Sequence, residues 1–185
     1  MSGGGAIVIE WIGTGNGVAQ LLGDVRLHVE EVFELPARVT VPAARPMDAY
    51  DPVRRQDLST ATLRWIVDHT PHDAVKVLGI TDHDLFISVL TYVFGQAQVG
   101  GRAAVVSTAR LHQDLGGLTA DERLFRARLR KECVHELGHT FGLTHCETRT
   151  CVMSRSNTIA DVDAKGGLCR DCSALLRELR AKENL

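Results

Sequence analysis

Short apolar segments separated by polar, glycine-bearing turns fill the first part of the chain. Residues 6–12 (AIVIEWI) and 74–81 (AVKVLGIT) are nearly continuous apolar runs, typical of strands buried on both faces. Residues 38–43 alternate between apolar and polar and predict a further strand. Residues 18–33 and 58–69 carry apolar positions mostly three and four apart, which predicts amphipathic helices. Strands that alternate with helices favour an α/β fold, with a mostly parallel sheet covered by helices.

A hairpin is predicted farther along the chain. Residues 91–97 and 102–108 are strand candidates, and Gly100 and Gly101 between them favour a tight reversal. One of these strands would then run against the others and lie at an edge of the sheet. Residues 44–56 are polar and rich in proline, and we expect a loop there.

A long helix is predicted near the middle of the sequence. Thr119 and Glu122 have the spacing of a capping box, with Thr119 as the N-cap. The helix should run for about 20 residues and carry the histidine motif near its end.

The stretch from His135 to His145 reads H-E-x-x-H-x-x-G-x-x-H. His135 and His139 are four residues apart, so they lie on one face of a helix and can share a Zn²⁺ ion. Glu136 flanks that ion as a candidate catalytic base. Gly142 allows the chain to turn back, which brings His145 round as a third ligand and leaves a fourth position open for water. The alternative is three unrelated histidines on a core helix, a coincidence expected roughly once in ten thousand such sequences.

All five cysteines lie in the last third of the chain. Cys146, Cys151, Cys169 and Cys172 form two short spans that match a tetrahedral structural zinc site. Two disulfides or free thiols are the alternatives. Cys133 precedes the first histidine by two positions, so it should point away from the metal as a buried apolar side chain. The sequence therefore predicts two Zn²⁺ ions per chain, one catalytic and one structural.

The overall composition limits the class of protein. The 185 residues suit a single domain, and 44% hydrophobic with 24% charged residues is ordinary for a globular protein. The formal net charge of −2 and the 5% aromatic content argue against a nucleic-acid partner. The chain has no apolar run long enough for a membrane span, and its first residues lead us to expect no secretory signal. We therefore expect a cytoplasmic monomer that has no inhibitory pro-segment.

The histidine motif followed by Met153 is the metzincin signature. With the four cysteines, and with residues 77–85 and 93–97, the chain resembles the archaemetzincins. That resemblance implies a zincin-like fold with a twisted five-stranded, mostly parallel sheet above the motif helix and an edge strand along the cleft. It also implies one catalytic domain, with an N-terminal subdomain (1–142) and a small zinc-stabilised C-terminal subdomain (143–185). Met153 would form an apolar floor under the histidines.

These residues favour a zinc-dependent enzyme that hydrolyses peptide bonds. Zinc would lower the pKa of bound water, and Glu136 would take the proton and pass it to the leaving amine. The substrate would be a peptide or protein, extended against the edge strand. The alternative is a catalytically weak or inactive module, stabilised by zinc, that binds peptides or proteins without turnover.

Overall fold

The computed structural model describes residues 5–42, 44–112 and 121–185. The strands are β1 (Ala6–Trp11), β2 (Ala37–Thr40), β3 (Tyr50–Asp51), β4 (Gln56–Leu58), β5 (Ala74–Thr81), β6 (Leu85–Ile87), β7 (Leu90–Val93), β8 (Gly95–Ala97) and β9 (Ala103–Ser107). The helices are α1 (Ala19–Phe33), α2 (Ser59–His69), α3 (Glu122–Thr140), α4 (Ile159–Ala164) and α5 (Arg170–Lys182), with a 3₁₀ turn at Met47–Ala49.

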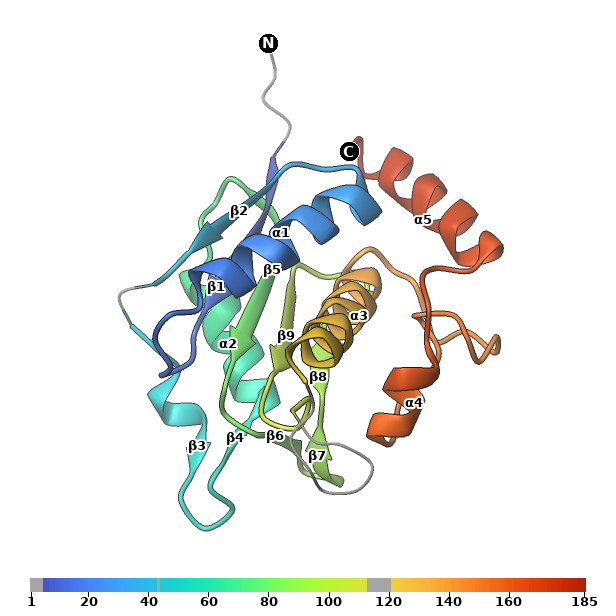
Figure 1. Ribbon diagram of the computed structural model, residues 1–185. Coiled ribbons are helices and arrows are strands. Elements are labelled where there is room, and N and C mark those ends of the chain that lie inside the picture. The colour runs from blue at the N-terminus through green and yellow to red at the C-terminus, as the bar shows by residue number, and fades with distance from the viewer. Residues whose placement is uncertain (1–4, 43, 113–120) are drawn as a thin grey trace.

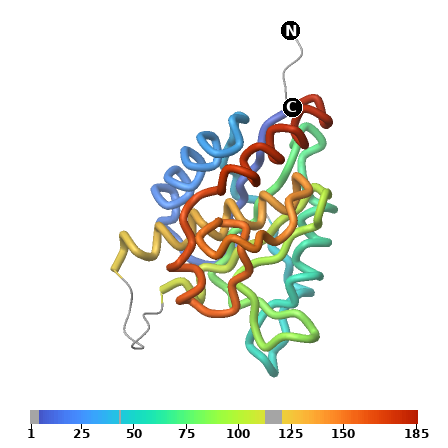
Figure 2. The backbone as a smooth tube through the Cα atoms, turned by 90° about the vertical axis from the view of Figure 1, so that its right-hand side faces the viewer, coloured from blue at the N-terminus to red at the C-terminus, as the bar shows by residue number. Residues whose placement is uncertain are grey.

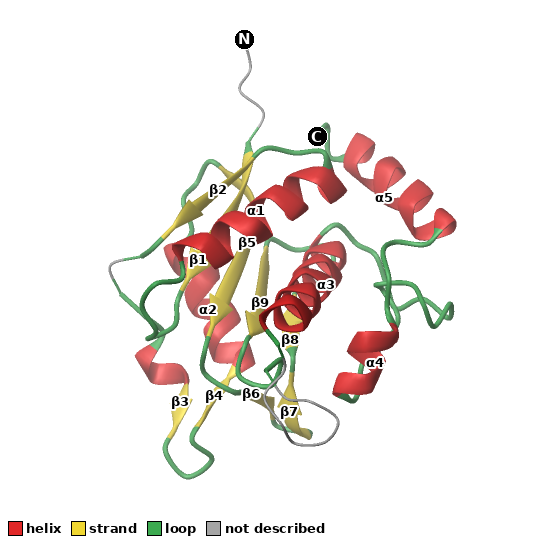
Figure 3. Ribbon diagram, viewed as in Figure 1, coloured by secondary structure: helices red, strands yellow, loops and turns green. Residues whose placement is uncertain are grey.

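The main sheet has five strands in the order β2-β1-β5-β9-β8. The first four are parallel, and β8 pairs antiparallel with β9 at the edge. Helices α1 and α3 cover one face and α2 covers the other (Figures 1 and 3). The central strands β1 and β5 are almost wholly buried, as their continuous apolar runs predict. The expected α/β fold with a mostly parallel five-stranded sheet is confirmed.

Two predictions about the connections are wrong. Residues 44–56 do not form a plain loop, because β3 and the start of β4 lie there in a second sheet of order β3-β4-β6-β7. These strands are two or three residues long, too short for an alternating pattern to show. The expected strand at 91–97 is two strands, β7 in the second sheet and β8 in the first, which part at Phe94. The reversal at Gly100 is confirmed, with a φ of 65°.

Helix α3 begins differently from the prediction. Its N-cap is Asp121, whose carboxylate accepts a hydrogen bond from the Leu124 N–H at 2.7 Å, and Glu122 is its first residue. The predicted cap, Thr119, lies outside the described residues. The helix then runs to Thr140, so the expected length of about 20 residues and the position of the histidines near its end are confirmed.

The segment after α3 packs back on that helix through buried ion pairs. The Arg128 guanidinium is fully buried, and two of its nitrogens lie 2.7 Å from the two carboxylate oxygens of Asp163 on α4. Figure 2 shows α4 and α5 beside α3 on one flank of the molecule. The apolar core is continuous across this boundary, since it holds Leu137 of α3 together with Val162 and Leu176. Within the described ranges, no helix combines the length and the apolar character that crossing a bilayer requires.

Candidate metal centres and active-site cleft

Three histidines meet at the end of α3. One ring nitrogen from each of His135, His139 and His145 lies within 4.8 Å of the other two. The Nε2 atoms of His135 and His139 are 3.2 Å apart. Two nitrogens on a tetrahedral zinc with Zn–N bonds of 2.0–2.1 Å are separated by roughly 3.3 Å. The structure therefore brings together the three predicted ligands at the spacing of a zinc site.

Backbone carbonyls orient two of these rings. The Nδ1 atom of His135 lies 2.8 Å from the Val152 carbonyl oxygen, and that of His139 lies 2.7 Å from the Leu143 carbonyl oxygen. A carbonyl only accepts, so both Nδ1 atoms carry the proton and both Nε2 atoms present lone pairs to each other. Two lone pairs at 3.2 Å repel unless a cation lies between them. The donor set thus fits a bound metal ion.

The turn at Gly142 brings His145, the third predicted ligand, back to the other two histidines. Gly142 has a φ of 97°, in the region that favours glycine, and its N–H donates to the His139 carbonyl oxygen at 2.9 Å. The next N–H, of Leu143, donates to the Gly138 carbonyl oxygen at 3.0 Å. These bonds close the end of α3 and reverse the chain, so that His145 faces the other two histidines.

The surroundings keep the histidines neutral. Burial lowers the pKa of all three, and for His135 the lowering is large, with further contributions from Lys165 and His139. Zinc binds the neutral imidazole, so the site is in its ligating form at neutral pH.

Glu136 lies beside the histidines, under the edge strand. A Cβ atom placed on Gly95 of β8 would come within 2.6 Å of the Glu136 Cγ atom, so this close packing requires glycine. Glu136 is 5% exposed, and burial raises the pKa of its carboxyl group well above the usual range, with a further contribution from Glu132. A carboxylate whose pKa is raised in this way is suited to accept a proton from water and return it.

A buried ion pair lies beside Glu136 and His135. Lys165 Nζ lies 3.0 Å from Glu132 Oε1 and 3.4 Å from His135 Nδ1, and its side chain is fully buried. Glu132 is one helical turn before Glu136, so the two carboxylates share a face of α3. The Lys165 ammonium offsets part of their mutual repulsion.

Met153 packs against α3 between His135 and His139. It is fully buried, and a Cβ atom placed on Gly138 would come within 2.6 Å of its sulfur. Gly138 lies between the two helical ligands. Because Gly138 has no side chain, the thioether of Met153 can pack directly against the helix between these two histidines.

Two cavities flank the histidines along β8. The larger has a volume of about 420 Å³ and lies between β7, α3 and the segment that follows Met153. The smaller, of about 330 Å³, lies at the other end of β8 beside His139 and Thr144. His135, Glu136 and His145 line both cavities. Together the cavities form a cleft that runs along the edge strand β8, beside the predicted metal site.

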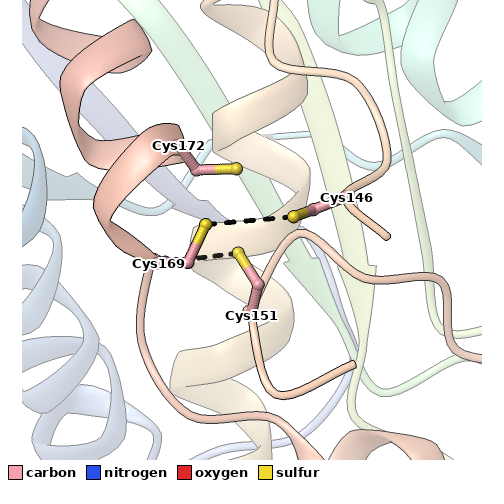
Figure 4. Close-up of side chains that lie close together, drawn as sticks. All are labelled: Cys146, Cys151, Cys169 and Cys172. Carbon is pink, nitrogen blue, oxygen red and sulfur yellow. Dashed lines mark hydrogen bonds between the residues drawn. The ribbon is translucent and has the colours of Figure 1, made fainter. Parts of the chain in front are cut away.

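The four cysteines form a second cluster, shown in Figure 4. The sulfurs of Cys146, Cys151, Cys169 and Cys172 all lie within 4.8 Å of one another, and none forms a disulfide. The Cys146 and Cys169 sulfurs are 3.9 Å apart. Sulfurs on a tetrahedral zinc with Zn–S bonds of 2.3 Å are separated by roughly 3.8 Å. The arrangement fits a structural zinc and rules out the predicted alternative of two disulfides in this structure.

Backbone donors favour thiolates at this cluster. The Cys169 N–H lies 3.3 Å from the Cys151 sulfur, and the Thr148 N–H lies 3.4 Å from the Cys146 sulfur. A hydrogen bond from the Cys172 N–H at the start of α5 is the main reason that the pKa of Cys169 falls to about 7. Cys133 is fully buried in the core and is not among these four, as predicted.

Sequence reasoning missed the groups that surround the ligands. Glu132 could have been found, because it lies four residues before Glu136 on a predicted helix. Lys165 and the Val152 carbonyl group had no such signal, since they follow the turn and reach α3 only through the fold. Tyr92, to which the sequence assigned no role, lines the larger cavity.

Known proteins resemble this chain in sequence and in fold. Residues 10–178 match the model of peptidase family M54. The archaemetzincin of Methanopyrus kandleri is 45% identical over 155 residues, which cover 80% of this chain and 83% of that protein. The crystal structure of the M. kandleri protein superposes with a TM-score of 0.83 at 37% identity and covers 98% of each chain.

A second solved structure points the same way. A zinc-dependent peptidase from Methanocorpusculum labreanum is similar with a TM-score of 0.78 at 28% identity, covering 92% of this chain and 100% of that one. The archaemetzincin of Archaeoglobus fulgidus is 41% identical over 149 residues, 80% of this chain and 82% of that protein. The chain therefore belongs to peptidase family M54, together with the archaemetzincins, and is a zinc metallopeptidase.

Proposed function

We propose that Glu136 is the catalytic base of this peptidase and that His135, His139 and His145 hold its catalytic zinc. When bound there, zinc acts as a Lewis acid that lowers the pKa of water and polarises a carbonyl group. Glu136 accepts a proton from the attacking water and then gives it to the amine that leaves. The observation that carries this assignment is the placement of Glu136, which lines both halves of the cleft beside the three converging imidazoles.

The peptide is proposed to lie extended along β8. Among the described residues, this strand pairs with β9 on one side only, so its other edge can hydrogen-bond a substrate backbone. The antiparallel arrangement is slightly more stable per residue than the parallel one. With that direction, the C-terminal side of the substrate lies in the larger cavity at the Gly95 end of β8.

Substituting the base tests this proposal. Glu136→Ala should retain both zinc ions and abolish hydrolysis of a peptide library analysed by mass spectrometry. Glu136→Gln keeps the shape of the side chain against Gly95 and should give the same result. If these variants still cleave peptides, Glu136 is not the catalytic base. Peptide binding without any turnover by the wild-type protein would favour the binding-module alternative.

We further propose a second, structural zinc at Cys146, Cys151, Cys169 and Cys172, so that each chain holds two zinc ions. Free thiols at metal spacing support a reducing compartment such as the cytoplasm. The chain would act as one catalytic domain, with subdomains at 1–142 and 143–185. Both ligand sets come from a single chain, which supports a monomer. Metal analysis together with the molar mass in solution tests the stoichiometry and the monomer.

A further inference from the structure

The wall of the larger cavity carries a positive charge that the proposed mechanism does not use. Arg155 lies two residues after Met153 and lines this cavity with His135, Glu136 and His145. Among the described residues that line the cavity, Arg155 is the only lysine or arginine.

The guanidinium of Arg155 is available to a ligand. Within the part of the chain that the structure describes, it makes no ion pair or hydrogen bond. The nearby acid Glu132, which lines the same cavity, is already paired with Lys165 at 3.0 Å. Glu136, the remaining carboxylate of the lining, is packed against Gly95 under β8. Neither acid is therefore paired with Arg155.

A cross-cleft hydrogen bond connects this wall to the opposite rim. The Tyr92 hydroxyl of β7 donates to the Asn157 carbonyl oxygen at 2.8 Å, two residues beyond Arg155. The capping box of Thr158 and Asp161 at the start of α4 holds the next part of the segment. Arg155 is thus attached to a backbone that is tied to both sides of the cavity.

We propose that Arg155 makes this peptidase prefer substrates with a carboxylate just C-terminal to the scissile bond. This inference rests on the proposed function and on the antiparallel placement of the substrate along β8. A guanidinium pairs with a carboxylate through two parallel hydrogen bonds, which suits an acidic side chain or the terminal carboxylate of a short peptide. Both sources present the same group to Arg155.

The test compares peptides that share one cleavable sequence. The residue after the scissile bond is Glu, Gln or Lys, and each peptide ends either in a carboxylate or in an amide. The kcat/KM of wild-type enzyme should be roughly fivefold higher for Glu than for Gln, as expected for a partly exposed ion pair. A preference for the free carboxylate end over the amide would identify the terminal group as the partner instead.

Variants of Arg155 should change this preference in a defined direction. Arg155→Gln should erase it, Arg155→Lys should retain part of it, and Arg155→Glu should reverse it in favour of the Lys peptide. Arg149→Gln is the matched control, because Arg149 is exposed in the same segment and does not line the cavity. Zinc content and circular dichroism confirm that each variant is folded and loaded.

Two failures can be told apart. If wild-type enzyme shows neither a preference among the Glu, Gln and Lys peptides nor a preference for the carboxylate end, or keeps its preference in Arg155→Gln, the role of Arg155 is refuted while the peptidase mechanism stands. If no peptide is cleaved by zinc-loaded wild-type enzyme, the proposed function fails, and the inference about Arg155 fails with it.

Discussion

Replacing Cys172 by serine should weaken zinc binding at the histidine site, although Cys172 touches none of the histidines. The structure connects the two sites through one short segment. Cys146 directly follows His145, and its N–H donates to the Met153 carbonyl oxygen at 3.0 Å. Cys151 directly precedes Val152, whose carbonyl oxygen accepts from the Nδ1 of His135, a proposed metal ligand, at 2.8 Å. The four-cysteine cluster therefore holds both ends of the segment that completes the histidine site.

The size of the effect follows from what the segment supplies. A structural zinc contributes on the order of 10 kcal/mol to folding in small domains, so losing one of four thiolates releases much of the order in residues 143–169. The histidine site then loses a fixed third ligand and the carbonyl group that orients His135. Loss of such outer partners costs roughly 10–100-fold in metal affinity. We expect a weakening in that range at the histidine site of Cys172→Ser.

Replacing zinc by Co²⁺ allows the two sites to be followed separately. Thiolate ligands give bound Co²⁺ an absorption band that imidazole ligands do not produce. Competition with a chromophoric chelator then gives the affinity of each site. Ser173→Ala is the control, since Ser173 is the next residue on α5 and supplies no ligand. The coupling is refuted if Cys172→Ser empties the cysteine site while the histidine site keeps its wild-type affinity.

Two further predictions concern stability. Burial raises the pKa of Glu10 on β1, and its Oε2 has no hydrogen-bond partner within the described residues, so the folded state binds the proton more tightly than the unfolded chain does. The folded protein therefore loses stability as the pH rises from the usual glutamate range through the folded-state pKa of Glu10. Glu10→Gln should raise the free energy of unfolding by about 1 kcal/mol at pH 7 and leave it unchanged near about pH 4. Urea unfolding at the two pH values measures the difference. Gly142→Ala should destabilise the protein by more than about 1 kcal/mol, because Gly142 has a φ of 97°. Gly23→Ala in α1 should instead stabilise the protein by about 0.5–1 kcal/mol, because no atom lies within 4 Å of the added Cβ. Equal effects of the two glycine variants on thermal unfolding would contradict this reasoning.

The cluster of three histidines could be predicted from sequence because it depends on local geometry. The periodicity of a helix places His135 and His139 on one face, and a glycine with a positive φ explains how His145 returns to them. The main sheet could be predicted for a similar reason, since its central strands are long and buried on both faces. Each of these features is set by residues that are close together in the sequence.

The remaining features depend on contacts between distant segments. The second sheet is built from strands of two to four residues, which carry no periodic pattern. Helices α4 and α5 were not predicted, because their boundaries follow from packing on α3 and from the cysteine cluster. The pairing of Lys165 with Glu132 spans 33 residues and has no signature in either segment. Sequence therefore gives the ligands but not the groups that orient them.

Helix α3 and the segment after Gly142 contribute different parts of the site. Two of the three proposed metal ligands lie on α3, whereas the segment after Gly142 carries the third, His145, and places Arg155 on the wall of the cleft. Val152, Met153 and Arg155 lie within four residues of one another in that segment, and they respectively orient a ligand, support the helix below the metal site and face the cleft. A substitution at Arg155 changes only a side chain on the cavity wall, so we expect it to alter the substrate preference and leave the proposed ligands in place. A substitution at the cysteines, in contrast, should disturb all three functions together.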